Sequence, residues 1–178
     1  ISCSTATGGT ASSSRDYPQG TSLTITASPA TNYQPTWPSL GGTASGNTYT
    51  FIAPTTGTTA ASVAYSKIQH TLSVSISNSP ESNTYSGVVT SDLSIYCYKG
   101  PNQGLPSSCS ETFDKDSASS IEVNIEPANI ESGWTASLSC ECTSCTKNPD
   151  FANSCFVKRD SSNTLSATFT KSTGGSGS

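Results

Sequence analysis

Apolar and polar residues alternate along most of this chain, which is the pattern of half-buried β-strands. Turn signals rich in Gly and Pro separate the alternating segments, for example at residues 18–20, 40–42 and 99–102. Many short strands at regular spacing predict an all-β protein. The predicted strands lie at residues 23–27, 49–52, 63–65, 72–76, 88–89, 93–98, 121–125, 134–138, 156–157 and 165–169.

The alternating pattern occurs twice, in two related versions. One version surrounds Trp37 and the other surrounds Trp134, and the closing strands place Tyr65 in the first where the second has Phe169. Duplicated modules typically build an extended body in which each unit packs on its neighbour, rather than one catalytic pocket. The repeat therefore predicts architecture more directly than chemistry.

The repeat also predicts the domain boundaries. Each module is expected to be a small β-sheet unit, either a sandwich or a grasp-like fold. The first module is incomplete: residues 1–3 match residues 95–97, and the two strands that precede residue 95 have no counterpart. A β module without these strands exposes unpaired backbone groups at a sheet edge. The predicted parts are a flexible arm (1–16), the incomplete first module (17–67), a Cys-rich second module (68–171) and a Gly/Ser tail (172–178).

Composition narrows the functional classes. The 178 residues include 36 Ser and 26 Thr, while charged residues make up only 11% and the net charge is −4. The 8 Lys and Arg are scattered, so nucleic-acid binding is not expected, because that needs a clustered basic face. No apolar run approaches the roughly 20 residues of a membrane span. Seven Cys without Met indicate disulfides and an oxidising, extracellular compartment.

The second module carries a set of short motifs in a fixed order. The set resembles the extracellular bacterial repeats related to the internalin-type B-repeat, over residues 71–171 well and over residues 17–67 in part. The resemblance implies a secreted or surface protein of bacteria, whose repeats serve as stalks, spacers, adhesive modules or assembled subunits. It transfers no catalytic residues. The motifs are Gly87-Val88-Val89-Thr90-Ser91, Cys97, Cys109 with Phe113, Ile121-Glu122-Val123, Gly133-Trp134, Cys155-Phe156-Val157 and Leu165-Ser166-Ala167-Thr168-Phe169.

Four of the cysteines are expected to form two disulfides. Cys97 and Cys109 are predicted to pair, closing a loop of about 13 residues worth about 3 kcal/mol in the chain-entropy account. The family resemblance implies that Cys140 pairs with Cys155. Other pairings within the segment from residue 140 to residue 155 stay open at this point.

The remaining cysteines allow more than one interpretation. Cys142 and Cys145 are left as a local bridge, although their spacing is also that of zinc ligands. A structural zinc site usually has a second such pair, so a disulfide is favoured. Cys3 then has no partner within the chain, so it is expected to be free, linked to another chain or paired with sequence upstream.

No residues point to catalysis, a cofactor or a metal site. His70 is interpreted as an ordinary polar strand residue, because no nucleophile motif surrounds any Ser. Glu122 and Glu126 alternate with apolar positions and are expected on a solvated strand face. Asp114 and Asp116 lack the Gly and the distant Glu of a calcium loop, so a solvated turn is expected.

These observations predict a non-enzymatic extracellular structural protein, a subunit of a bacterial surface filament that associates with identical subunits through β contacts. An adhesin stalk, or a module that binds surface glycans or a host protein, is the alternative. Tyr96 and Tyr98 are its candidate binding residues, because aromatic rings stack on sugars and partner surfaces. A third option is an inactive accessory domain of a secreted hydrolase.

Overall fold

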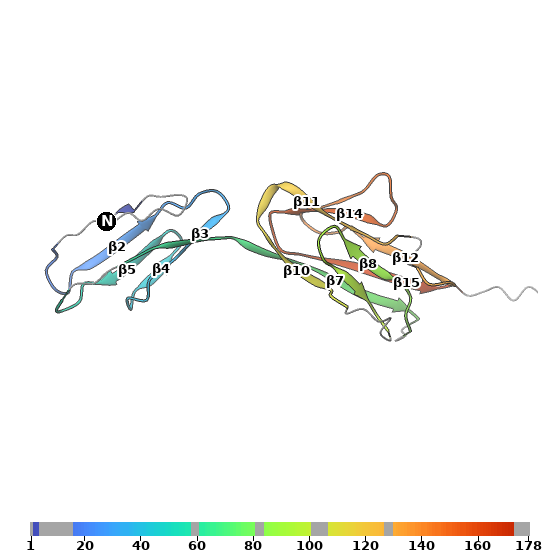
Figure 1. Ribbon diagram of the computed structural model, residues 1–178, viewed down its shortest axis with the longest axis horizontal. Helices are drawn as coiled ribbons and strands as arrows, with labels where there is room; N and C mark the ends of the chain where they lie inside the picture. The colour runs from blue at the N-terminus through green and yellow to red at the C-terminus, as the bar shows by residue number, and fades with distance from the viewer. Residues whose placement is uncertain are drawn as a thin grey trace, which may run out of the picture. The chain divides into compact units, whose positions relative to one another are not determined.

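The computed structural model describes residues 2–3, 16–57, 61–80, 84–100, 107–126 and 130–172. All the regular secondary structure in these residues is β, as the alternating pattern predicts. The chain divides into two compact units, Ile1–Ile68 (unit 1) and Gln69–Ser178 (unit 2). Figure 1 shows both units as layered strands.

Unit 1 contains a four-stranded sheet and a separate pair of strands. The sheet has the order β1-β2-β5-β4 and consists of β1 (Ser2–Cys3), β2 (Ser22–Ala27), β4 (Thr43–Ser45) and β5 (Thr48–Ile52). The pair consists of β3 (Tyr33–Thr36) and β6 (Ala64–Lys67). The buried core is small: Ile25, Tyr49 and Phe51, with Trp37 stacked on Tyr49 at 5.7 Å between ring centroids.

Unit 2 contains two sheets around one core. The first has the order β10-β7-β15-β12, and the second has the order β13-β14-β11-β8-β9. One cluster of buried residues draws on both sheets, including Leu72 and Phe169 from the first and Val123 from the second, so unit 2 is a β-sandwich. The strands are β7 (Gln69–Ser79), β8 (Val88–Ser91), β9 (Tyr96–Tyr98), β10 (Ser110–Asp114), β11 (Asp116–Asn124), β12 (Trp134–Ser139), β13 (Cys145–Lys147), β14 (Ser154–Arg159) and β15 (Asn163–Lys171).

The strand pairings of unit 1 recur in unit 2. The antiparallel pair β2–β5 joins Leu23 to Phe51, and β11–β14 joins the matching Ile121 to Val157. The strand β4 lies beside β5 as β13 lies beside β14, and the antiparallel pair β3–β6 corresponds to β12–β15. The sequence repeat is therefore accompanied by a repeated set of pairings.

The repeat predicts that Trp37 and Trp134 occupy equivalent positions, and this prediction is wrong. Trp134 lies opposite Lys171 in the β12–β15 pair, but the residue opposite the equivalent Lys67 is Tyr33. Trp37 lies beyond the end of β3, where its ring packs on Tyr49 instead. The two Trp thus stabilise their cores from different positions.

The first strand also differs from the expectation of a flexible arm. Ser2 and Cys3 form β1, which runs parallel to β2 with Cys3 opposite Ala27. This is the side on which β8 flanks β11 in unit 2, so β1 lies at the position of β8 rather than that of β9, although β1 runs parallel to β2 and β8 runs antiparallel to β11. Unpaired backbone groups at the edge of β2 favour such an addition. Residues 4–15 of the predicted arm and 173–178 of the predicted tail lie outside the described residues.

Gly42 is required by close packing in unit 1. A Cβ atom there would collide with the backbone oxygen of Thr50 and come within 2.8 Å of the Phe51 Cβ. The Gly42 N–H also donates a hydrogen bond of 2.8 Å to the Tyr49 hydroxyl. We expect Gly42→Ala to destabilise unit 1 by about 2 kcal/mol through overpacking, measured by chemical denaturation with the indole signal of Trp37 as the probe.

The neighbouring Gly41 provides the control for this prediction. Its φ is 68° and no atom lies within 4 Å of an added Cβ, so Gly41→Ala introduces only left-handed backbone strain of about 1 kcal/mol. Equal losses of stability in the two variants would show that packing against Thr50 and Phe51 does not determine the role of Gly42.

Candidate functional site

Two disulfides link the two sheets of unit 2. Cys97 in β9 is bonded to Cys109, which directly precedes β10, with 4.6 Å between their Cα atoms. Cys140, which follows β12, is bonded to Cys155 in β14, with a Cα separation of 5.6 Å. These are the predicted pairings. Since β10 and β12 belong to one sheet and β9 and β14 to the other, both bonds hold the sandwich closed.

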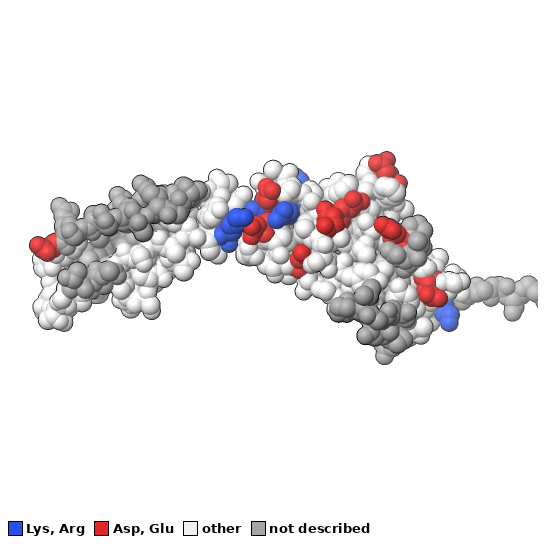
Figure 2. All heavy atoms as spheres, viewed as in Figure 1, with Lys and Arg blue, Asp and Glu red and all other residues white. Residues whose placement is uncertain are grey.

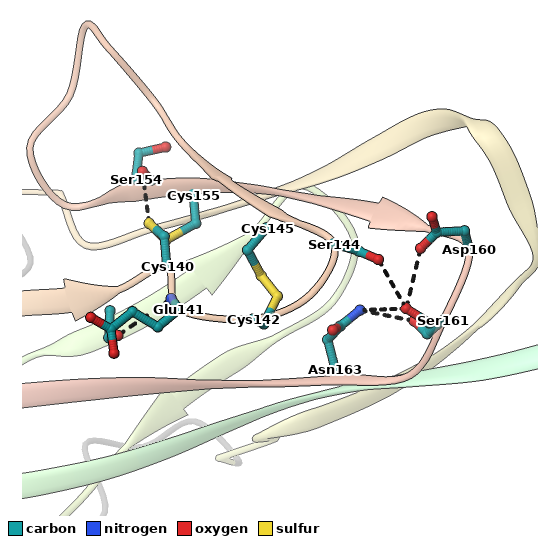
Figure 3. The surroundings of a disulfide bond; sticks show 11 residues. Cys140, Glu141, Cys142, Ser144, Cys145, Ser154, Cys155, Asp160, Ser161 and Asn163 are labelled. Carbon is teal, nitrogen blue, oxygen red and sulfur yellow. Dashed lines mark hydrogen bonds between the residues drawn. A yellow bond between two sulfur atoms is a disulfide. The ribbon is translucent and has the colours of Figure 1, made fainter.

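The third disulfide, between Cys142 and Cys145, closes a short turn at the surface (Figure 3). Both cysteines are partly exposed, and the Cys145 N–H donates to the Cys142 carbonyl at 3.2 Å. In the part of the chain that the structure describes, no group of three or more His, Cys, Asp or Glu is placed to hold a metal ion. The pair thus forms the local disulfide that the sequence analysis favours.

Cys3 is the seventh cysteine. Its backbone lies in β1 beside Ala27, while its side chain lies outside what the structure describes. A link from Cys3 to another subunit stays a prediction.

The strand β6 has fewer sheet neighbours than its counterpart in unit 2. The strand β15 lies between β12 and β7, and β7 runs parallel to it over the pairs from Asn163–Leu72 to Thr170–Ser79. Within the described residues, β6 is paired with β3 alone. We call the side of β6 that faces away from β3, together with residues 61–63 that precede the strand, the β6 edge.

The difference in neighbours is reflected in burial. The core positions of β15 are almost inaccessible: Leu165 is 1% exposed, and Ala167 and Phe169 are 0% exposed. At the corresponding positions of unit 1, Ala61 is exposed, and Val63 and Tyr65 are only partly buried. Apolar positions that are sealed in unit 2 are therefore accessible to a partner in unit 1.

Tyr96 and Tyr98, the candidate binding residues, belong to one half-buried aromatic group with Tyr85. The Tyr98 ring meets Tyr85 and Tyr96 edge-on, at centroid distances of 5.9 and 6.1 Å. Burial, followed by the electrostatic influence of Tyr96 and Glu131, raises the pKa of Tyr85 above its ordinary value. All three rings remain partly exposed, and a binding role for Tyr96 and Tyr98 stays a prediction.

The carboxylates of Glu122 and Asp116 accept hydrogen bonds that the sequence does not predict. Glu122 is partly buried, and its Oε1 accepts hydrogen bonds from Ser154 Oγ at 2.8 Å and from Asn148 Nδ2 at 3.1 Å. The expectation that Glu122 is solvated is wrong, because β14 brings these donors beside it. Asp116 likewise begins β11 instead of lying in a turn. Hydrogen bonds from the Ser119 hydroxyl and the Ala118 N–H lower the Asp116 pKa.

His70 lies in β7, in keeping with its assignment as a strand residue. Its ring packs beside Phe113 in β10 at 6.2 Å between centroids. The nearest hydroxyl and carboxylate groups show no hydrogen bond to its Nε2 within the described residues. His70 is therefore a residue that packs against Phe113 across the β7–β10 pair.

A groove at the end of β11 and β14 was not predicted from the sequence. Its volume is about 670 Å³, and Phe151 is 65% exposed beside it. Glu122, Glu126 and Asn153 are among the residues that line it. Phe151 lies in a Cys-rich loop and not in an alternating segment, so the strand pattern gave no reason to select it.

Charged side chains do not gather into a large basic surface on the face seen in Figure 2, where uncharged residues predominate and basic residues lie among acidic ones. No helix in the described ranges is long and apolar enough to cross a membrane. The disulfides are compatible with a secreted protein. A scan against protein-family models and searches of curated proteins and solved structures found no match for the chain.

Proposed function

We propose that this chain is a non-enzymatic structural subunit of a filament or other assembly at a bacterial surface, joined to identical subunits through β contacts. The observation that carries the proposal is the β6 edge, where β6 pairs with β3 alone in the described residues while its counterpart β15 pairs on both sides. A sheet edge with accessible apolar positions favours the addition of another strand. The resemblance to bacterial B-repeats supports the same assignment.

Cys3 provides a covalent component of this proposal. Six of the seven cysteines are joined in pairs within unit 2, which leaves Cys3 as the candidate for a bond between subunits. Such a bond would lie beside β2, because β1 places the Cys3 backbone next to Ala27.

The proposal is tested by the mass and gel mobility of native material with and without reductant. We expect a ladder of oligomers that collapses on reduction, with Cys3 in the cross-linked peptide. Cys3→Ser should abolish the ladder but leave non-covalent oligomers visible in light scattering. A chain that remains a folded monomer at all concentrations and in both redox conditions would exclude assembly as its role.

The groove beside Phe151 favours a second candidate function, the binding of a surface glycan or host protein by an adhesin module. An exposed ring next to carboxylate and amide groups offers stacking together with hydrogen bonds, which is suitable chemistry for a sugar. A glycan array tests this candidate. Phe151→Ala should abolish binding, while Ile52→Ala, which alters a residue 60% exposed in unit 1, should not. Loss only on replacement of Tyr96 or Tyr98 would locate the site at the aromatic group instead.

A further inference from the structure

We propose that the β6 edge accepts an extended peptide segment with an apolar side chain at every second position, running parallel to β6 in the register of β7 against β15. This inference rests on the proposed function and deepens it, because it specifies the kind of segment that a neighbouring subunit must supply. The sequence of β7, QHTLSVSISNS, is the example of such a segment that the chain itself contains.

The orientation follows from the repeated pairings. The pair β3–β6 matches β12–β15, with Lys67 equivalent to Lys171. In unit 2 the opposite side of β15 is filled by β7, which runs parallel to it. The incoming strand takes the same side of the equivalent strand, so the inferred direction is that of β7, parallel to β6.

The register follows from the same equivalence. Leu165, Ala167 and Phe169 of β15 lie opposite Val74, Ile76 and Asn78 of β7. The matching residues of unit 1 are Ala61, Val63 and Tyr65. An incoming strand thus places apolar side chains beside Ala61 and Val63, and these are the positions at which unit 1 is more exposed than unit 2.

Backbone chemistry allows the addition at β6. Residues 61–66 contain no Pro, so each of them has a backbone N–H group. The opposite edge of the pair is less suitable, because β3 contains Pro35, and Pro cannot donate a ladder hydrogen bond. The β6 edge is therefore the side of this strand pair suited to sheet extension.

The experiment adds the β7 peptide, residues 69–79, to the full chain and follows amide hydrogen exchange. We expect exchange to slow by about tenfold or more at residues 62–66. A control peptide with Ser in place of Leu72, Val74 and Ile76 should give no protection, because it has no apolar face. Protection confined to residues 163–171 would mean that the peptide only replaces β7 in unit 2, and it would overturn the proposal.

Orientation is tested with a nitroxide label on either end of the peptide. In the parallel arrangement, a label at the C-terminal end broadens amide signals near Ser66, and a label at the N-terminal end does not. The reverse result would overturn the inferred orientation.

A matched pair of variants tests the register. Ala61 is exposed, so Ala61→Asp should leave the fold intact, but the carboxylate would face an apolar residue of the incoming strand. It should weaken peptide binding by about tenfold. Ala44→Asp, the same change at an exposed position of β4, should not. Equal affinities in the two variants would overturn the register.

These outcomes are distinguishable from failure of the proposed function. A chain that binds the peptide at residues 62–66 but never associates with its own copies has a strand-accepting edge without being a self-assembling subunit. A chain that forms oligomers but shows no protection at residues 62–66 assembles through another surface.

Discussion

Replacing Phe169 by Ala is expected to lower the free energy of unfolding of unit 2 by about 3–5 kcal/mol, the usual cost of removing a fully buried aromatic side chain. Phe169 is 0% exposed and belongs to the cluster shared by both sheets of the sandwich. Its loss removes contacts with both layers at once. Chemical denaturation followed by the indole signal of Trp134, the single Trp of unit 2, measures the effect.

Tyr65→Ala is the matched comparison, because Tyr65 occupies the equivalent position of unit 1. Its ring is only partly buried, so the loss should be smaller, about 2 kcal/mol or less. The indole signal of Trp37 reports on unit 1. Similar losses for the two variants would contradict the view that this position is sealed in unit 2 and open in unit 1.

Removal of the Cys97–Cys109 disulfide is expected to have the second largest effect. The bond joins positions 12 residues apart in sequence. Without it the unfolded chain gains conformational entropy, which lowers the free energy of unfolding by about 3 kcal/mol. Loss of the bond also frees β9 from the opposite sheet. Cys97→Ala combined with Cys109→Ala should therefore unfold unit 2 at a clearly lower denaturant concentration, with unit 1 unchanged.

The Cys142–Cys145 bond provides the control. It joins positions only 3 residues apart and lies at the surface, so replacing both by Ala should cost about 2 kcal/mol or less. Mild reduction followed by alkylation and mass spectrometry should also label this pair before the buried Cys97. A greater loss of stability from the surface pair would show that the cross-link between the sheets is not the main contribution.

The alternating pattern predicted the fold class and the long strands well. Strands such as β2, β7 and β15 have one buried and one solvated face, and that arrangement is encoded locally in a period of two. Short strands carry too little of the pattern. The sequence TAS of β4 has no apolar stripe, and β3 contains Pro35, which argues against a strand unless that strand lies at an edge.

The candidate site could be predicted only in part. The missing strands and the odd cysteine pointed to unit 1, because gaps in a repeat can be read from sequence. The particular edge could not be identified, since the position of β1 beside β2 depends on tertiary pairing that no local pattern encodes. The groove at Phe151 was missed for a similar reason: β11 and β14 bring its residues together from distant parts of the chain.

The parallel pairing of β7 with β15 also determines how unit 2 carries mechanical load. The strand β7 is the first of the unit and β15 is the last, so tension along the chain enters through one and leaves through its immediate neighbour. Because the two strands are parallel, pulling slides them past each other, and the ladder from Asn163–Leu72 to Thr170–Ser79 is sheared as a whole. A ladder that is sheared as a whole resists extension better than a hairpin, in which the hydrogen-bonded pairs open one at a time. A parallel strand at the β6 edge would give unit 1 the same resistance, so in a filament under tension, strength would come from the joint between subunits.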